Sequence, residues 1–257
     1  MNAQVKAIVV SGYGFNADAE LAEAFRLAGA LPERVHLADL LAEPGRLDGA
    51  GLLGFPGGFS FGDHLGSGQL VALLCRRSLR PALESFVARG GLAIGICNGF
   101  QSLARMGMLP NRAGSWEREA SLVANASGRF VDTWVKVRFE PGCRSPWTRG
   151  LPDRMLPVRH GEGRFVMRAP APRKPNPLDE LEAEGLVALR YDPAEDPNGS
   201  ERRIAGVCDP TGRVLGLMPH PEAFLFRENH PLRRRGSADR PGLDLFENGV
   251  AAARAAT

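Results

Sequence analysis

The chain has 257 residues, of which 44% are hydrophobic and 24% charged, an ordinary composition for a globular protein of one large domain or two small ones. The formal net charge is only +3, and no basic run is interleaved with aromatic residues, so a nucleic-acid partner is not expected. No apolar stretch is long enough to cross a bilayer and the amino terminus lacks the layout of a signal peptide, so we expect a cytoplasmic protein with no membrane partner. The four cysteines form no Cys-x-x-Cys pair, which predicts reduced thiols and no metal site.

The first part of the chain alternates strand-like and helix-like segments. Strands are expected over Val5–Val10, Val35–Leu40 and Gly51–Phe55, and a helix is expected over Leu21–Ala28. Such alternation predicts a parallel sheet covered by helices on both faces. The turn Gly12–Gly14 lacks the third glycine of a dinucleotide-binding fingerprint, so it is interpreted as a plain strand-to-helix turn.

A glycine-rich loop, Pro56–Asp63, directly follows the third expected strand. Backbone N–H groups of such a loop can bind an anion, but the Gly-Lys-Ser/Thr ending of a nucleotide-binding loop is missing. From the residues alone, two interpretations stay open. The loop is either a flexible turn or a source of oxyanion donors near the carboxyl ends of the strands, where open α/β sheets bind ligands. Cys75, in the helix that follows, is interpreted as a packing residue.

The segment Gly91–Gln101 reads G-L-A-I-G-I-C-N-G-F-Q and predicts a strand that turns abruptly into a helix at Cys97. Glycines two residues to either side of Cys97 allow the close backbone approach of the G-x-S-x-G nucleophile elbow, here with sulfur in place of oxygen. The N–H groups at the start of the helix favour the thiolate form of a cysteine placed there. A buried, unreactive cysteine is the alternative, and a matching base elsewhere must decide between them.

The strand–helix rhythm breaks between Asn111 and Arg168, where imperfect alternation around Trp134 predicts a strand with one exposed face. His160 and Glu162 are expected in a turn between two strand-like runs, where an isolated histidine is usually polar surface. The proline-rich segment 169–177 is expected to be a loop, and a short helix is expected over Leu178–Glu184.

A last strand, Val214–Met218, is followed by Pro-His-Pro-Glu, and a closing helix is expected over Asp244–Ala253. Proline pushes the residue before it towards extended backbone, in which positions two apart face the same way. His220 and Glu222 can therefore project together, so that the carboxylate orients the imidazole and stabilises its protonated form. A proline-stiffened turn with two solvated side chains is the alternative. The arginine-rich segment 233–240 is interpreted as a solvated loop or a contact for a phosphate or partner.

Together, the motifs G-I-C-N-G-F-Q, P-G-G-F-S-F-G-D and M-P-H-P-E resemble, in order and spacing, those of class I glutamine amidotransferases. N-A-S-G-R-F, H-G-E-G, D-P-N-G-S and G-F-N-A-D-A-E make the resemblance specific to the glutaminase subunit of phosphoribosylformylglycinamidine synthase. The resemblance runs from about Val5 to Glu222 and implies a flavodoxin-like α/β fold, a mostly parallel central sheet flanked by helices, with an added antiparallel segment. One domain over residues 1–257 is expected.

The resemblance implies hydrolysis of glutamine to glutamate and ammonia for de novo purine biosynthesis. Cys97 would be the nucleophile, His220 the base and Glu222 its orienting acid. Backbone N–H groups of Gly58 and Asn98 would bind the oxyanion, and Gln101, His160 and Glu162 are weaker candidates for holding glutamine.

The same resemblance implies a synthetase subunit as partner, together with a small accessory subunit. ATP and Mg²⁺ are expected at the synthetase, where formylglycinamide ribonucleotide becomes the amidine, and no cofactor is expected in this chain.

Two rival functions remain. One is a protease or hydratase with a cysteine at the elbow of a similar sheet, against which the paired His220 and Glu222 far downstream argue. The other is a glutaminase-like subunit retained only as an interaction module, which would typically lose its nucleophile or base.

Overall fold

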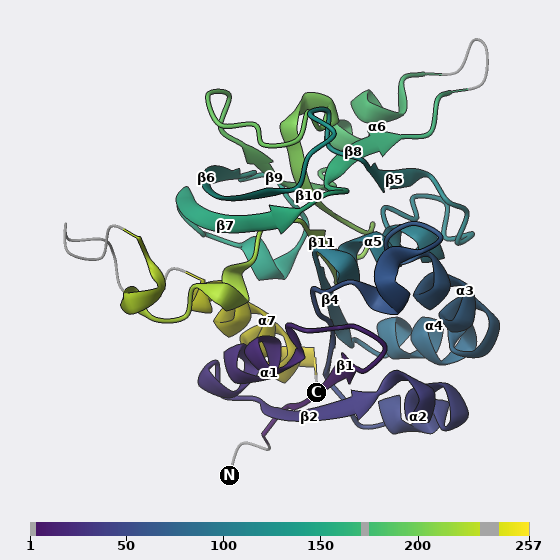
Figure 1. The fold of residues 1–257 in the computed structure, drawn as a ribbon. Coiled ribbons are helices and arrows are strands. Elements are labelled where there is room, and N and C mark those ends of the chain that lie inside the picture. The colour runs from purple at the N-terminus through teal and green to yellow at the C-terminus, as the bar shows by residue number, and fades with distance from the viewer. Residues whose placement is uncertain (1–3, 171–174, 232–241, 257) are drawn as a thin grey trace.

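One nine-stranded sheet runs through the computed structural model, which describes residues 4–170, 175–231 and 242–256 (Figure 1). The arginine-rich segment 233–240 and part of the proline-rich segment lie outside the described residues. The strands of the large sheet are, in spatial order, β2 (Leu31–His36), β1 (Lys6–Ser11), β3 (Leu52–Phe55), β4 (Leu92–Ile96), β11 (Val214–Leu217), β10 (Ile204–Cys208), β9 (Val187–Tyr191), β6 (Val131–Phe139) and β7 (Arg154–His160). A second sheet pairs β5 (Ala120–Val123) with β8 (Arg164–Met167). The helices are α1 (Asp18–Leu27), α2 (Leu37–Ala42), α3 (Gln69–Ser78), α4 (Arg80–Ala88), α5 (Asn98–Met106), α6 (Pro177–Ala183) and α7 (Leu243–Ala256).

The first five strands of that order are parallel and form the half of the molecule that we call the parallel half. Their order, β2-β1-β3-β4-β11, is that of a flavodoxin-like sheet. Helices α1 and α7 cover one face and α3, α4 and α5 the other (Figure 1). Strands β3 and β4 are buried along their whole length, as both faces of a covered parallel sheet must be. The expected fold class is confirmed.

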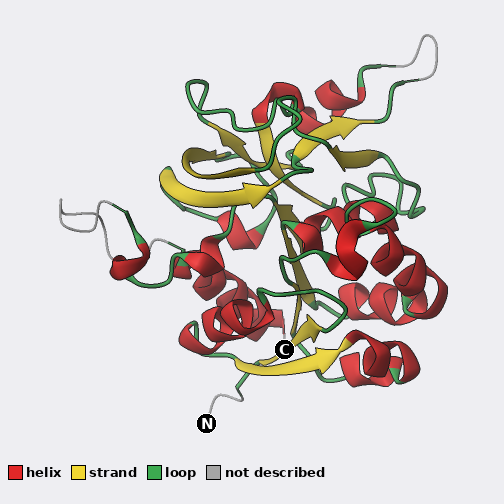
Figure 2. Ribbon diagram, in the orientation of Figure 1, coloured by secondary structure: helices red, strands yellow, loops and turns green. Residues whose placement is uncertain are grey.

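The remaining strands form what we call the antiparallel half: β10, β9, β6 and β7 pair antiparallel, and the β5–β8 sheet packs beside them against α5. Figure 2 shows that this half is made mostly of strands and loops, whereas the helices gather around the parallel half. In β7, buried and partly exposed side chains alternate, which is the pattern of a sheet with one covered face. The added antiparallel segment expected from the sequence is therefore present.

The sheet curls so that its far edge returns to its middle. Strand β7 is five strands away from β4 in the sheet order. Yet the backbone N–H of His220, just after β11, donates to Pro157 O of β7 at 2.8 Å. The thiol of Cys97, just after β4, is 3.7 Å from Arg159 O. Strand β7 thus lies across the carboxyl ends of β4 and β11 (Figure 1).

The strand expected over Val35–Leu40 is wrong in its bounds. The strand is β2, which ends at His36, and α2 begins at Leu37. The His36 imidazole accepts a hydrogen bond from Ala38 N (3.2 Å) and so caps the helix. Strand β2 is an edge strand with a single buried residue, Val35, which is why its sequence carries no clear apolar pattern.

None of the described helices is both long and apolar enough to span a membrane.

Candidate active site

Cys97 occupies the corner between β4 and α5 in a backbone conformation that L-residues rarely adopt. Its φ is 52° and its ψ is −106°. Such strain persists only where the surroundings enforce it, and it is typical of the nucleophile elbow. Cys97 N donates to Leu217 O of β11 at 2.8 Å, which fixes the corner to the neighbouring strand.

The glycine at position 99 lets the elbow turn this sharply. A Cβ at Gly99 would lie 1.9 Å from Phe55 O, the last carbonyl of β3. A Cβ at Gly95 would in turn lie 2.7 Å from the carbonyl carbon of Gly99. The first turn of α5 therefore lies directly against β3, and its free N–H groups converge beside Cys97.

His220 and Glu222 follow β11 and meet in the interior. Nδ1 of His220 is 2.6 Å from Oε1 of Glu222, and both residues are 2% exposed. The contact is the expected one, but it arises differently: Pro221–Ala223 is a single 3₁₀ turn rather than extended chain. Within the described residues, Nε2 of His220 has no hydrogen-bond partner although it is buried, so it is available to a substrate or to Cys97.

The electrostatics of this pair favour a charged imidazole. Burial disfavours the imidazolium, but attraction by Glu222 and Cys97 outweighs burial and raises the pKa of His220 to about 10. His220 therefore carries a proton at neutral pH, in a position between a carboxylate and the nucleophile.

The glycine-rich loop is held in place from two sides. Phe59 N donates to Gly14 O (2.9 Å) and Asn16 N to Gly57 O (3.1 Å), so the loop pairs with the turn after β1. The Asn98 side chain accepts from Ser60 N at 3.2 Å and so joins the loop to α5. Gly58 lines the same cavity as Cys97 and His220, and Asn98 supplies the first N–H of the helix. These contacts hold the backbone of the loop in one conformation. They therefore favour the interpretation of the loop as a source of oxyanion donors over that of a flexible turn.

Gln101 and Glu162 lie beside the site without lining its cavity. Gln101 Nε2 donates to Glu162 O, and Gln101 Oε1 accepts from Asn98 Nδ2 at 3.0 Å. The Glu162 carboxylate faces away, towards Ser67 N (3.3 Å) and Arg105 (3.5 Å). In this arrangement both side chains hold the β7–β8 turn against α5, and a direct contact with glutamine stays a prediction.

His160 is not the surface residue that its turn-like surroundings indicated. It ends β7, and only 2% of it is exposed. Its Nδ1 lies 3.1 Å from Oδ1 of Asn125, and the Asn125 amide nitrogen donates to His160 O (2.8 Å). Oδ1 can only accept, so Nδ1 carries the proton of a neutral ring. Burial, reinforced by repulsion from His220, lowers the pKa of His160 to about 4.

A cavity of about 320 Å³ opens above Cys97 and His220. Six of the residues that line it were not among the site residues expected from the sequence: Asn16, Glu20, Phe59, Phe130, Asp132 and Arg159. Glu20 lies on α1, whereas Asp132 and Arg159 are cross-strand partners on β6 and β7. Glu20 ends the motif G-F-N-A-D-A-E, whereas Asp132 and Arg159 lie in no quoted motif, because only the curl of the sheet brings β7 to the elbow.

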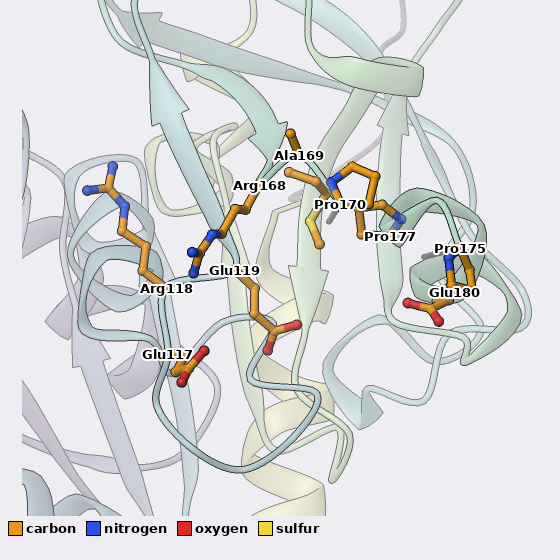
Figure 3. A pocket seen from close by; sticks show the side chains of 10 residues that line it. Glu117, Arg118, Glu119, Arg168, Ala169, Pro170, Pro175, Pro177 and Glu180 are labelled. Atoms are coloured by element: carbon orange, nitrogen blue, oxygen red, sulfur yellow. The ribbon is translucent and has the colours of Figure 1, made fainter. Parts of the chain in front are cut away.

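A larger cavity of about 540 Å³ lies elsewhere, beside β8 and the start of α6 (Figure 3). Figure 3 shows charges of both signs around it, including Arg118, Arg168 and Glu119. Its lining contains no cysteine, serine, threonine or histidine, so we place the chemistry in the smaller cavity. In the described part of the chain, no group of three or more His, Cys, Asp or Glu residues could hold a metal ion.

Comparison with known proteins agrees with this geometry. The sequence profile of the CobB/CobQ-like glutamine amidotransferase domain matches residues 4–251. Phosphoribosylformylglycinamidine synthase subunit PurQ of Dehalococcoides mccartyi is 38% identical over 98% of both chains. The same subunit of Methanococcus maripaludis is 38% identical over 88% of this chain and 86% of that one. The chain belongs to the PurQ family of glutamine amidotransferases.

The chain also resembles a solved structure in its fold. In the structure of PurLQS from Thermotoga maritima, one chain is 31% identical to this protein, with a TM-score of 0.73 over 97% of this chain and 99% of that chain. The resemblance expected from the motifs and the enzyme class are thus confirmed. Cys97 and His220, the residues expected as nucleophile and base, line one cavity, so no observation favours either of the two rival functions.

Proposed function

We propose that this chain is the glutaminase subunit of phosphoribosylformylglycinamidine synthase and that Cys97, His220 and Glu222 are its catalytic triad. One observation carries the proposal: a strained elbow cysteine and a buried His220–Glu222 pair, 2.6 Å apart, open onto the same cavity.

The chemistry follows from these positions. The Cys97 thiolate attacks the carboxamide carbon of glutamine, and the N–H groups of Gly58 and Asn98 stabilise the oxyanion that forms. Removal of one such donor typically costs about 3 kcal/mol of transition-state stabilisation. His220, already protonated, gives its proton to the departing nitrogen, so that ammonia leaves and a thioester remains. Water, deprotonated by His220, then attacks the thioester, and the Cys97 thiolate leaves as glutamate is released, which restores the thiolate and the protonated His220.

The ammonia has to reach an acceptor before it is protonated. We propose that a synthetase subunit binds this chain, with a small accessory subunit, and uses ATP and Mg²⁺ to convert formylglycinamide ribonucleotide to the amidine. The relation to a chain in the structure of PurLQS supports an assembly of this kind.

A single domain over residues 1–257 also stays a proposal, supported by one sheet that continues from β2 to β7.

The reconstituted complex tests the proposal. Cys97→Ala is expected to abolish amidine synthesis from glutamine and to leave synthesis from added ammonia intact, because free ammonia bypasses the thioester. Cys143→Ser, at a half-buried thiol outside the cavity, serves as the matched control and is expected to keep both activities. Equal loss of both activities in Cys97→Ala would show that Cys97 is not the nucleophile.

A further inference from the structure

Three charged side chains surround the mouth of the cavity above Cys97. Arg159 pairs with Glu20, with Nη2 and Oε2 3.0 Å apart, and their side chains are 38% and 45% exposed. Asp132 is the cross-strand partner of Arg159 in the β6–β7 ladder, so both side chains project from the same face of the sheet. The other residues that line the cavity, apart from Cys97 and His220, are uncharged.

These charges lie close to the reacting group. The backbone of Arg159 approaches the nucleophile, since Arg159 O lies 3.7 Å from Cys97 Sγ. The guanidinium extends from there to Glu20 on α1 and borders the cavity. A substrate whose carboxamide rests on Cys97 would therefore present the other end of its chain to Arg159, Glu20 and Asp132.

We propose that this cluster selects the α-amino acid head of the substrate: Arg159 binds the α-carboxylate, and Glu20 and Asp132 bind the α-ammonium group. The inference rests on the proposed function. Glutamine carries one negative and one positive charge two methylene groups from its carboxamide, and the cluster offers one cation and two anions. Guanidinium is suited to this task because its planar fork binds a carboxylate through two parallel hydrogen bonds.

The ion pair between Arg159 and Glu20 has a second explanation. It could simply join α1 to β7, as many exposed pairs join neighbouring elements, at a gain of about 0–1 kcal/mol. A purely structural pair would affect all substrates alike. A selective pair would discriminate among amides that differ only in the head group, and this difference provides the test.

The test compares three amides in the complex with its synthetase, by release of ammonia. They are glutamine, 4-aminobutanamide, which lacks the α-carboxylate, and 4-carbamoylbutanoate, which lacks the α-ammonium group. Arg159→Gln is expected to lower kcat/KM for glutamine about 10- to 100-fold, the range of a charge-assisted hydrogen bond, mainly through KM. The same variant should leave 4-aminobutanamide unaffected. The double variant Glu20→Gln/Asp132→Asn should impair glutamine and spare 4-carbamoylbutanoate.

Arg34→Gln is the matched control. Arg34 of β2 pairs at 3.3 Å with Asp18, which lies on α1 as Glu20 does, but Arg34 does not line the cavity. This variant should leave all three amides unchanged. Equal losses on all three amides in Arg159→Gln, or no loss on glutamine, would overturn the proposal that this cluster selects the α-amino acid head. Failure of the wild-type complex to release ammonia from glutamine would instead overturn the proposed function.

Discussion

The two halves of the molecule contribute to the site in different ways. The parallel half supplies the proposed reacting groups, which follow three of its strands: Gly58 after β3, Cys97 after β4 and His220 after β11. The antiparallel half supplies part of the surroundings, since Arg159 lines the cavity and His160 lies buried next to it on the same strand. The positions of the proposed catalytic residues therefore follow from local strand–helix geometry, whereas the positions of Asp132 and Arg159 depend on how β7 returns to the middle of the sheet.

The largest effect is expected at the close approach between α5 and β3 in the parallel half. Gly99→Ala places a Cβ 1.9 Å from the Phe55 carbonyl oxygen, and neither backbone can yield without displacing the elbow. We expect a loss of more than about 4 kcal/mol in the free energy of unfolding, or no soluble protein. Urea denaturation measures it. Gly142→Ala, where nothing lies within 4 Å of the added Cβ, should change stability by less than about 0.5 kcal/mol. Similar stabilities of the two variants would contradict the rigid elbow.

The next largest effect is expected at Glu222, just after β11, the strand between the parallel and antiparallel halves, and it should change turnover but not folding. Glu222→Gln keeps the shape of the side chain but removes the charge that stabilises protonated His220. We expect kcat for glutamine hydrolysis to fall about 10³- to 10⁴-fold, as when the acid of a triad is neutralised. Circular dichroism should show an intact fold. Glu228→Gln, at an exposed position nearby, is the control and should retain turnover. Wild-type turnover in Glu222→Gln would remove the residue from the triad.

A pH-dependent effect is expected in the antiparallel half, at His160. In the folded state the imidazole of His160, with a pKa of about 4, becomes protonated only below about pH 4, whereas an unfolded histidine becomes protonated below about pH 6.5. Since the unfolded state holds more protons between these values, stability falls as the pH drops from about 6.5 to about 4, by up to about 3 kcal/mol.

His160→Gln should therefore remove this part of the pH dependence, measured as urea midpoints from pH 4 to pH 7. His64→Gln, at an exposed histidine, should keep the wild-type slope. An unchanged slope in His160→Gln would mean that another group causes the acid sensitivity.

The smallest effect concerns ion pairs. In the antiparallel half, Arg190 pairs with Glu140 (2.6 Å) and Glu182 (2.7 Å), and its side chain is 19% exposed. Arg190→Met is expected to cost about 1–2 kcal/mol of stability, because it removes charged hydrogen bonds from a half-buried network. Lys6→Met removes the exposed pair with Glu33 between β1 and β2 and should cost less than about 0.5 kcal/mol. Equal costs would indicate that both halves depend on ion pairs to the same degree.

The contrast between the halves also explains what the sequence reveals. The elbow and the His220–Glu222 pair could be predicted because each lies within a few residues of chain and has a local signal. The bounds of β2 could not, because an edge strand with one buried residue has no periodicity. Burial of His160 could not be predicted either, since its partner Asn125 lies 35 residues away and the two meet only through the β5–β8 and β6–β7 pairings.

The same limit applies to Arg159, Glu20 and Asp132. They come from β7, α1 and β6, and Arg159 and Glu20 are 139 residues apart. Glu20 lies on α1 of the parallel half, and its motif does not reveal which residues it will meet. Only the curl of the sheet makes Asp132 and Arg159 neighbours of Cys97.

The place of β11 in the sheet has a consequence for how the protein is synthesised. Strand β11 is the last strand of the large sheet to be synthesised, and it lies between β4 and β10. His220 leaves the ribosome 123 residues (220 − 97) after Cys97. At about 5–20 residues per second, this interval is about 6–25 s. During that time the nascent chain has the Cys97 thiol without its proposed base, so we expect it not to hydrolyse glutamine. The pairing of β11 with β4 is also what brings His220 to Cys97.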